Sequence, residues 1–358
     1  MIKYILKKIS YSFLVLFGVA TIVFFLFNIL PGDPADIILG PHATPEAVEK
    51  IHIKLGYNRP ILTQYEMYLN DLSFISLHNG TNPSSPIFLD TAKYSFVKLF
   101  HISDEKVFVL KYPYLRKSYI DEEKVSAVIK RTLPETIVLA LSSILLAAIL
   151  GIVLGVFAAL YKDTWVDKCA LVFSALNISL PSFVSGLIIM WVFGFVLRDY
   201  LNLNHVGSLY TTNDFGEREL TLKNLILPTI TLGLRPLALI VQLTRSSMLD
   251  VLSMDYIRTA RAKGVGFAKV VFKHALKNAL NPVVTAISGW FAGLMAGAIF
   301  VEKIFDWKGI GLQVFDALLK KDLPVVMGAT LVFATFFVLI NLIVDIIYSF
   351  LDPRVRIK

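Results

Sequence analysis

Long apolar runs separated by short charged segments dominate the chain. Each run is long enough to cross about 30 Å of hydrocarbon at about 1.5 Å per residue of helix. One run is apolar except for Arg235, and Pro228 and Pro236 are expected to interrupt it. The pattern predicts an all-α polytopic membrane protein with six transmembrane helices, over residues 1–30 (with the N-terminal tail), 135–161, 169–197, 225–244, 282–301 and 324–346.

The first run follows a basic leader that contains Lys3, Lys7 and Lys8. A secretory signal has the same order of features. Its apolar region would be shorter, however, and a small-x-small cleavage site would follow it. We therefore expect an uncleaved membrane anchor.

The charge of the connecting segments predicts the orientation in the membrane. Six spans put both termini on one side, together with residues 161–168, 245–281 and 351–358. The segment 245–281 carries seven Lys and Arg residues against Asp250 and Asp255. Because basic residues collect on the cytoplasmic side, both termini are expected to be cytoplasmic. Residues 31–133, 198–224 and 302–324 are then outside, and the first of these is long enough to form an extracytoplasmic cap. The chain thus divides into 1–30, the cap 31–133 and a core domain 134–358, in which 245–281 is a cytoplasmic loop.

The composition is typical of a membrane protein and reduces the number of possible partner classes. Of the 358 residues, 56% are hydrophobic and only 17% are charged. A net charge of +8 could indicate nucleic acid, but the basic residues flank apolar runs, which favours anionic lipid and no nucleic-acid partner. Cys169 is the only cysteine, and the six histidines lack metal-ligand spacing, so neither a metal site nor a disulfide within the chain is expected.

Small residues recur at helical spacing in two of the predicted spans. Gly151 and Gly155 lie in the second span, and Gly289, Gly293 and Gly297 lie in the fifth. Residues four apart share a helix face, where glycine allows close approach of another helix. These glycines could serve static packing within the chain. They could instead form a helix contact that slides or tilts, or a contact with a second subunit.

Away from the ends of the predicted spans, Arg235 is the one charge that falls inside them. A charge at mid-membrane is costly, so it should face protein or water. It could line a translocation path and meet a substrate carboxylate, or it could cap carbonyls freed near Gly233 and Pro236. Arg245, at the end of the same span, is expected to be a headgroup anchor.

The segment 253–281 is expected to contain two short helices joined at Gly264. Asp255 can cap the first helix, and Gly264 suits the left-handed position that ends it. The first helix, 256–263, is too short to be stable alone and therefore needs a partner surface. The second has Lys269, Lys273 and Lys277 on one face. An amphipathic loop on the membrane surface is the alternative to a docking element.

Several stretches together resemble the permease subunits of binding-protein-dependent ABC importers, in the oligopeptide, dipeptide and nickel group. The resemblance covers nearly the whole chain, although residues from about 73 to 123 form an additional insertion in the cap. The matching stretches are Leu30 to Ala35, Leu243 to Leu249, Asp255 to Gly264, His274 to Pro282, Phe305 to Gly311, Pro324 to Val326, and Leu351 to Arg354.

The resemblance implies that the loop is the EAA coupling loop, which docks into an ATP-binding subunit. Arg258-Thr259-Ala260 stand at the Glu-Ala-Ala positions and Gly264 at the glycine, whereas Lys277 replaces the usual proline. The implied coupling residues are Asp255, Tyr256, Arg258, Thr259, Ala260, Arg261, Lys263 and Gly264.

The resemblance also implies the partners and the location. The partners are a second homologous permease, two ATP-binding subunits, an extracytoplasmic substrate-binding protein and the lipid bilayer of the bacterial inner membrane. The chain has no phosphate-binding motif G-x-x-x-x-G-K-[ST], so no catalytic residue or cofactor of its own is expected, and ATP and Mg belong to the partner subunits.

The implied substrate is a di- or oligopeptide, while nickel and an oligosaccharide remain open. An ion-gradient-driven secondary transporter is a different class of protein. It would carry acidic residues within spans, often in two matching halves, and neither feature is present in the sequence.

Overall fold

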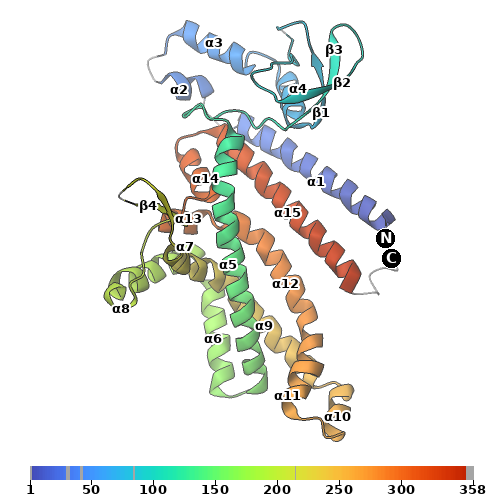
Figure 1. Ribbon diagram of the computed structural model, residues 1–358, viewed down its shortest axis with the longest axis vertical. Coiled ribbons are helices and arrows are strands. Elements are labelled where there is room, and N and C mark those ends of the chain that lie inside the picture. Colours follow the sequence, from blue (N-terminus) through green and yellow to red (C-terminus); the bar gives the residue numbers. More distant parts are fainter. Residues whose placement is uncertain (1, 30–32, 41–42, 84, 214, 352–358) are drawn as a thin grey trace. The chain divides into compact units, whose positions relative to one another are not determined.

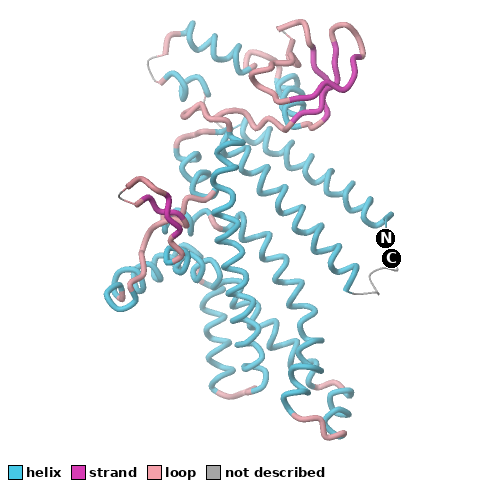
Figure 2. The backbone as a smooth tube through the Cα atoms, viewed as in Figure 1, coloured by secondary structure: helices cyan, strands magenta, loops and turns pink. Residues whose placement is uncertain are grey.

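The computed structural model describes residues 2–29, 33–40, 43–83, 85–213 and 215–351. Helices make up most of it (Figure 2). The chain divides into two compact units: unit 1 is Met1–Ile9, Thr132–Phe315 and Thr335–Lys358, and unit 2 is Ser10–Arg131 and Asp316–Ala334. Residues 30–32 of the Leu30 to Ala35 stretch, and the part of the C-terminal stretch beyond Leu351, lie outside the described residues.

Unit 1 contains four long helices with shorter elements between them (Figure 1). The long ones are α5 (Val125–Leu160, which enters the unit at Thr132), α6 (Trp165–Ser179), α9 (Lys223–Leu252) and α12 (Leu276–Gly297). The second half of α15 (Leu323–Leu351) also belongs here. The shorter elements are α7 (Ser182–Ile189), a π-helix (Met190–Val196), α8 (Arg198–Leu201), the hairpin β4 (Tyr210–Thr212) and β5 (Arg218–Leu220), α10 (Asp255–Ala262), α11 (Phe267–Lys269), a second π-helix (Val270–Ala275), α13 (Ile299–Phe305) and α14 (Ile310–Leu319).

Among the described residues, five helices are long and apolar enough to cross a membrane. They correspond to the first, second, fourth, fifth and sixth predicted spans. The third predicted span, 169–197, is not one straight helix: α6 and the stretch Ser182–Val196 meet at an angle of 111°. Pro181 explains the break, because a proline disfavours helical backbone at the preceding residue, and Leu180 is extended with ψ 133°.

Helix α9 is continuous, so the expectation that Pro228 and Pro236 interrupt it is wrong. Both prolines lie inside its 30 residues. Each proline removes one backbone hydrogen bond, and a membrane helix tolerates this loss when neighbouring helices support it. Helices α6, α7, α12 and α13 all contact α9. Its side chains Leu227, Ile240 and Met248 are fully buried, so α9 forms the centre of unit 1.

The two glycine stripes have different surroundings. A Cβ atom added to Gly155 would lie 2.6 Å from Cβ of Thr244 and 2.8 Å from the carbonyl oxygen of Val241, and one added to Gly151 would lie 2.7 Å from Cγ2 of Ile240. Helix α5 therefore approaches α9 more closely than any other residue type allows. At Gly289 and Gly293 no described atom lies within 4 Å of the added Cβ. Gly297 ends α12, and its surroundings are outside the described side chains.

Unit 2 contains most of α1 (Ile2–Ile29), the first part of α15 and the segment between α1 and α5. The cap predicted over 31–133 ends where α5 begins at Val125, and its described part starts at residue 33, so from here the cap denotes residues 33–124. Its helices are α2 (Pro34–Leu39), α3 (Pro45–Leu55) and α4 (Ile61–Leu72). Strands β1 (Ile75–Asn79), β2 (Phe96–His101) and β3 (Lys106–Lys111) form an antiparallel sheet in the order β1-β3-β2. This sheet lies in the predicted insertion and was not expected from the sequence.

Two contacts attach the cap to helices of the same unit. Tyr65 and Tyr68 of α4 pack on Phe24 of α1 with ring centroids 5.1 and 5.3 Å apart, and the hydroxyls of Tyr65 and Thr21 are 2.7 Å apart. Asp322, just before α15, accepts hydrogen bonds from the Ser118 hydroxyl at 2.5 Å and the Tyr119 backbone N–H at 3.1 Å. The cap is thus held at both of these helices by polar as well as aromatic contacts.

The close contact at Gly155 generates a prediction about stability. We expect Gly155→Val to lower the stability of the chain by about 1–3 kcal/mol, because the added side chain must displace Thr244 or the backbone of α9. The measurement is the thermal unfolding midpoint of the purified chain in detergent. Gly293→Val is the matched control, since that position is open in the chain. Equal losses of stability in the two variants would contradict the assigned contact.

Candidate functional site

Helix α10 and the turn after it contain the residues that were expected to couple the chain to a partner. Figure 1 shows α10 and α11 at the end of α12 that lies away from α13. Ile257 of α10 is fully buried in a cluster with Val156 of α5, Met248 of α9 and Val271. Ile257 therefore anchors α10 on the ends of α5 and α9, and the partly buried Ala260 packs against the same cluster.

A polar contact adds to this anchor. The Nδ2 of Asn278, in α12, donates to the Tyr256 hydroxyl at 2.8 Å, and that hydroxyl lies 3.4 Å from the backbone carbonyl of His274. Helix α10 consequently contacts α5, α9 and α12.

The end of α10 has the geometry of a Schellman motif. The Gly264 N–H donates to the carbonyl of Arg261 at 3.0 Å, and the Val265 N–H donates to the carbonyl of Ala260 at 3.2 Å. Gly264 has φ +75°, so the expected left-handed conformation is confirmed. Only glycine adopts this conformation without a cost, and it directs the chain away from the helix axis.

The remaining side chains of α10 point away from the anchor. Exposed residues are Asp255, Arg258, Thr259, Arg261, Lys263 and, in the turn, Gly264, while Ala260 is half-buried. Asp255 and Arg258 form an ion pair at 3.4 Å, but their side chains are 94% and 80% exposed, so the pair contributes little. The result is a short basic surface that no part of the described chain covers.

Two details differ from the sequence expectation. Asp255 does not cap α10: the N-cap is Met254, and Asp255 is the first helical residue, where its charge still favours the helix N-terminus. The second expected helix is not separate either, because the chain runs as one helical stretch from Phe267 to Ala296. Its first two turns include a π-helix, in which Val271 and Ala275 are buried while Lys273 stays exposed.

Arg235 lies halfway along α9 and is exposed. It makes no hydrogen bond or ion pair with any residue that the structure describes, so it caps none of the described carbonyls near Gly233 and Pro236. Gln242 and Ser246 follow it at seven and eleven residues, on the same side of the helix, and neither is fully buried. Arg235, Gln242 and Ser246 are thus polar residues on one side of α9, although the apolar Leu239 lies between them.

Arg245 has a role that the sequence did not indicate. Its guanidinium pairs with the buried carboxylate of Asp167 in α6 through Nε and through Nη2, the latter at 2.7 Å from Oδ2. A buried carboxylate needs such a partner. Arg245 therefore joins α9 to α6 and is not the expected headgroup anchor.

Glu302, in α13, is a buried carboxylate that sequence reasoning passed over. It is fully buried and accepts hydrogen bonds from the Thr136 hydroxyl at 2.6 Å and from the Leu312 N–H at 2.9 Å. The Thr136 hydroxyl in turn accepts from the Ile310 N–H at 2.9 Å. Glu302 thus holds the N-terminus of α14 against α5, where free N–H groups favour a negative charge.

Its environment also changes its acidity. Burial raises the pKa of Glu302 to about 7, even though hydrogen bonds from Thr136, Leu312 and Gly311 favour the ionised form. A Cβ on Gly309 would overlap the carboxylate, which explains one of the two glycines in the Phe305 to Gly311 stretch. The signal available in the sequence was Glu302 followed by Gly309 and Gly311, seven and nine residues later.

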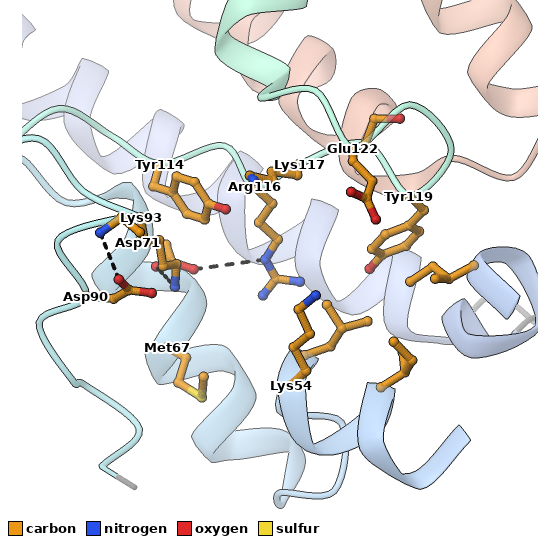
Figure 3. Close-up of a pocket in the computed structure, with 15 residues that line it drawn as sticks. Lys54, Met67, Asp71, Asp90, Lys93, Tyr114, Arg116, Lys117, Tyr119 and Glu122 are labelled. Carbon is orange, nitrogen blue, oxygen red and sulfur yellow. Dashed lines mark hydrogen bonds and ion pairs between the residues drawn. The ribbon is translucent and has the colours of Figure 1, made fainter. Parts of the chain in front are cut away.

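The cap contains a cavity of about 390 Å³ between α3, α4 and the segment that follows β3 (Figure 3). Asp71 is buried at its wall and pairs with Lys93 at 2.9 Å and with Arg116 at 4.0 Å, and the Tyr94 hydroxyl donates to it at 2.5 Å. The cap itself therefore compensates this charge. Across the described residues, no three His, Cys, Asp or Glu side chains gather so as to hold a metal ion.

Two sequence profiles of one family match the chain. The profile described as "Binding-protein-dependent transport system inner membrane component" matches residues 151–357, and the corresponding N-terminal profile matches residues 1–88. The chain belongs to this family. As an inner membrane component of a transport system it is a multi-pass membrane protein, in agreement with its apolar helices. Residues 89–150 lie outside both profiles.

Several similar proteins align with this transport component over at least 98% of their own length. A dipeptide transport system permease protein of Alkalihalophilus pseudofirmus is 34% identical over 99% of the chain and 100% of the relative. A putative peptide transport system permease protein of Brucella abortus is 35% identical over 98% of both. The glutathione transport system permease protein of Escherichia coli K12 is 33% identical over 100% of both. The crystal structure of an amino acid ABC transporter with histidines aligns with 60% of the chain and 92% of its own, at 14% identity and a TM-score of 0.41.

The buried Glu302 predicts a specific pH dependence of stability. Its pKa is higher in the folded chain than the ordinary 4.5, so the stability it contributes is present below pH 4.5 and is lost as the pH rises to about 7. The loss is on the order of 3 kcal/mol. We expect Glu302→Gln to flatten the fall of the unfolding midpoint between pH 5 and 8, measured in detergent.

The exposed Glu219 of β5 provides the control, because Glu219→Gln removes a carboxylate without touching a buried site. It should retain the wild-type slope. A Glu302→Gln variant with the wild-type slope would show that another group causes the pH dependence.

Proposed function

We propose that the chain is the membrane-spanning permease subunit of a peptide importer and that separate ATP-binding subunits drive it. Membership of the transport family supports this function, as do relatives described as dipeptide, peptide and glutathione permeases. The observation that carries the proposal is the exposed, basic and firmly anchored helix α10. An extracytoplasmic binding protein delivers the substrate, and a second permease subunit completes the path.

Helix α10 is proposed as the coupling element that docks on an ATP-binding subunit. Eight residues form too short a helix to persist alone, and α10 keeps only Ile257 fully buried within the chain. Its exposed Arg258, Arg261 and Lys263 suit a partner groove with acidic residues. When the ATP-binding subunits close, α10 moves, and the buried cluster around Ile257 transmits the movement to α5 and α9.

The orientation follows from this assignment. Docking on a soluble ATP-binding subunit places α10 in the cytoplasm, which agrees with the excess of basic residues in 245–281. Both termini are then cytoplasmic, while the cap and the hairpin β4–β5 face the outside.

Arg235 is proposed to line the path and to bind the carboxylate of a peptide. Its support is the exposed guanidinium in the middle of α9 with no partner in the described chain. An unpaired cation is unfavourable for the passage of Ni²⁺ and gives an uncharged oligosaccharide no charge to bind. The alternative substrates within the family are therefore less well supported than a peptide.

The open stripe on α12 is proposed to contact the second permease subunit. Gly289 and Gly293 are exposed, and the space over them is empty in the chain. A facing helix could approach there as closely as α9 approaches α5.

The coupling role of α10 predicts the effect of a backbone change at Gly264. We expect Gly264→Val to leave the protein in the membrane but to reduce peptide transport at least tenfold, because a β-branched residue resists φ +75° by about 1 kcal/mol or more. The helix would then leave its docking position. The measurements are co-purification of the ATP-binding subunits and peptide-stimulated ATP hydrolysis.

Gly266→Val is a close control. Gly266 is two residues away and equally open, but it has φ −57° and ψ 146°, which valine adopts readily. It should transport normally. If Gly264→Val retains wild-type coupling, then α10 is only a surface loop.

The proposed role of Arg235 predicts a dependence on the substrate's charge. Arg235→Gln should slow uptake of a peptide with a free C-terminal carboxylate about tenfold or more, while Arg235→Lys, which keeps the charge, should retain much of it. Uptake of the same peptide with an amidated C-terminus should differ little between the variants. The assay is uptake into vesicles that contain the assembled transporter. Equal losses for both peptides would assign Arg235 a structural role.

A further inference from the structure

One face of the sheet in the cap carries two apolar rows that are largely exposed, and the next row on that face is the pair Asn79 and Lys106. The strand register places Ile75, Leu110 and Val97 in one row across β1, β3 and β2. The next row on the same face contains Leu77, Phe108 and Phe100, and the rings of the last two are 5.0 Å apart. We call these six side chains the open face. No member of it is charged or polar.

The exposure of this face is large for a folded domain. Ile75 is 60% exposed, Val97 65%, Phe100 58% and Leu110 45%. Phe74 and Tyr112, which flank the first row, are 63% and 79% exposed. A continuous apolar patch of this kind marks a surface that meets another apolar phase.

The opposite face of the same sheet is well packed at β1 and β3, while Lys98 of β2 is exposed there. Val107 and Val109 of β3 are buried with Leu89 and Tyr94 in the core of the cap. The sheet therefore has a fixed register and a defined inner side, so the exposure of the outer side does not arise from loose folding.

The position of β1 indicates what covers the open face. Two residues separate the end of α4 from the start of β1, and α4 packs on α1 at Thr21 and Phe24. The apolar stretch of α1 continues to Asn28, so Thr21 lies seven residues, or about 10 Å, inside its outer end. Figure 1 shows α4 and β1 beside the C-terminal end of α1. The base of the cap thus lies beside the C-terminal part of the apolar stretch of α1.

The side chains beside this base continue the apolar surface of the span. Phe13, Ile22 and Leu26 of α1 are exposed on the same unit, as a helix in contact with acyl chains would have them. Phe74 and Tyr112 at the rim are aromatic residues, which favour the boundary between headgroups and hydrocarbon.

We propose that the open face of the sheet rests on the outer leaflet of the bilayer and anchors the cap there, beyond the anchoring that the spans provide. A lipid surface fits better than a protein partner, because a protein interface of this size would carry hydrogen-bonding groups, and the open face has none among its side chains. The inference rests on the orientation proposed above and is independent of the transported substrate.

Residues on the two faces of β2 allow a direct test in the full chain. In a Cys169→Ser background, Val97→Cys and Phe100→Cys are labelled with a small fluorophore, and the chain is reconstituted in vesicles of phosphatidylcholine and phosphatidylglycerol. Lys98→Cys is the matched control, because Lys98 lies between them on the same strand, pairs with the buried Val109 and is exposed. Tyr112→Cys replaces either apolar variant that fails to fold.

We expect nitroxide lipids to quench the label at positions 97 and 100 at least threefold more than at position 98. Iodide in the water phase should give the reverse order. Equal iodide quenching at all three positions, without lipid quenching, would overturn the proposal. Protection of positions 97 and 100 that appears only when the binding protein is added, or cross-linking between copies at these positions, would overturn it in favour of a protein interface.

Discussion

The close approach of α5 to α9 at Gly151 and Gly155 is the contact on which the rest of unit 1 depends. Between helices in lipid there is little hydrophobic gain, so association relies on the area and closeness of packing. The absent Cβ atoms let α5 reach the backbone of α9 at Val241 and the side chain of Thr244. With α5 held there, α9 is surrounded by α6, α7, α12 and α13 as well, and it becomes the most buried long helix of the chain.

The same contact continues directly into the anchor of α10. Val156 follows Gly155 on α5, and Met248 lies one turn after Thr244 on α9, and both pack against Ile257. Helix α10, the proposed coupling element, therefore packs on the helix pair whose spacing the glycines determine. Because α9 is one unbroken helix, the proposed displacement at Ile257 would also move the part of α9 that carries Arg235. This gives a physical route between the proposed docking surface and the proposed path.

Hydropathy and turn chemistry predicted the spans and the local conformation of Gly264, because both depend on a few neighbouring residues. The 111° bend at Pro181 could not be predicted from hydropathy, since apolar residues lie on both sides of it. Helix α9 continues through Pro228 and Pro236, although each proline removes one backbone hydrogen bond. Packing against helices distant in sequence compensates for these lost bonds. Glu302 was missed for the same reason: its partner Thr136 is 166 residues away. The sheet in the cap depends on pairing across a long loop, whose register a single sequence does not reveal.

The two glycine stripes show that residue spacing alone does not predict which stripe packs within the chain. Their spacing is the same, yet Gly151 and Gly155 are covered by α9 while the space over Gly289 and Gly293 is empty in the described chain. A glycine in a helix costs about 1 kcal/mol relative to alanine, and only close packing offsets that cost. On α5 the offset comes from within the chain. On α12 nothing in the described chain supplies this offset, and the proposed contact with a second permease subunit would supply it.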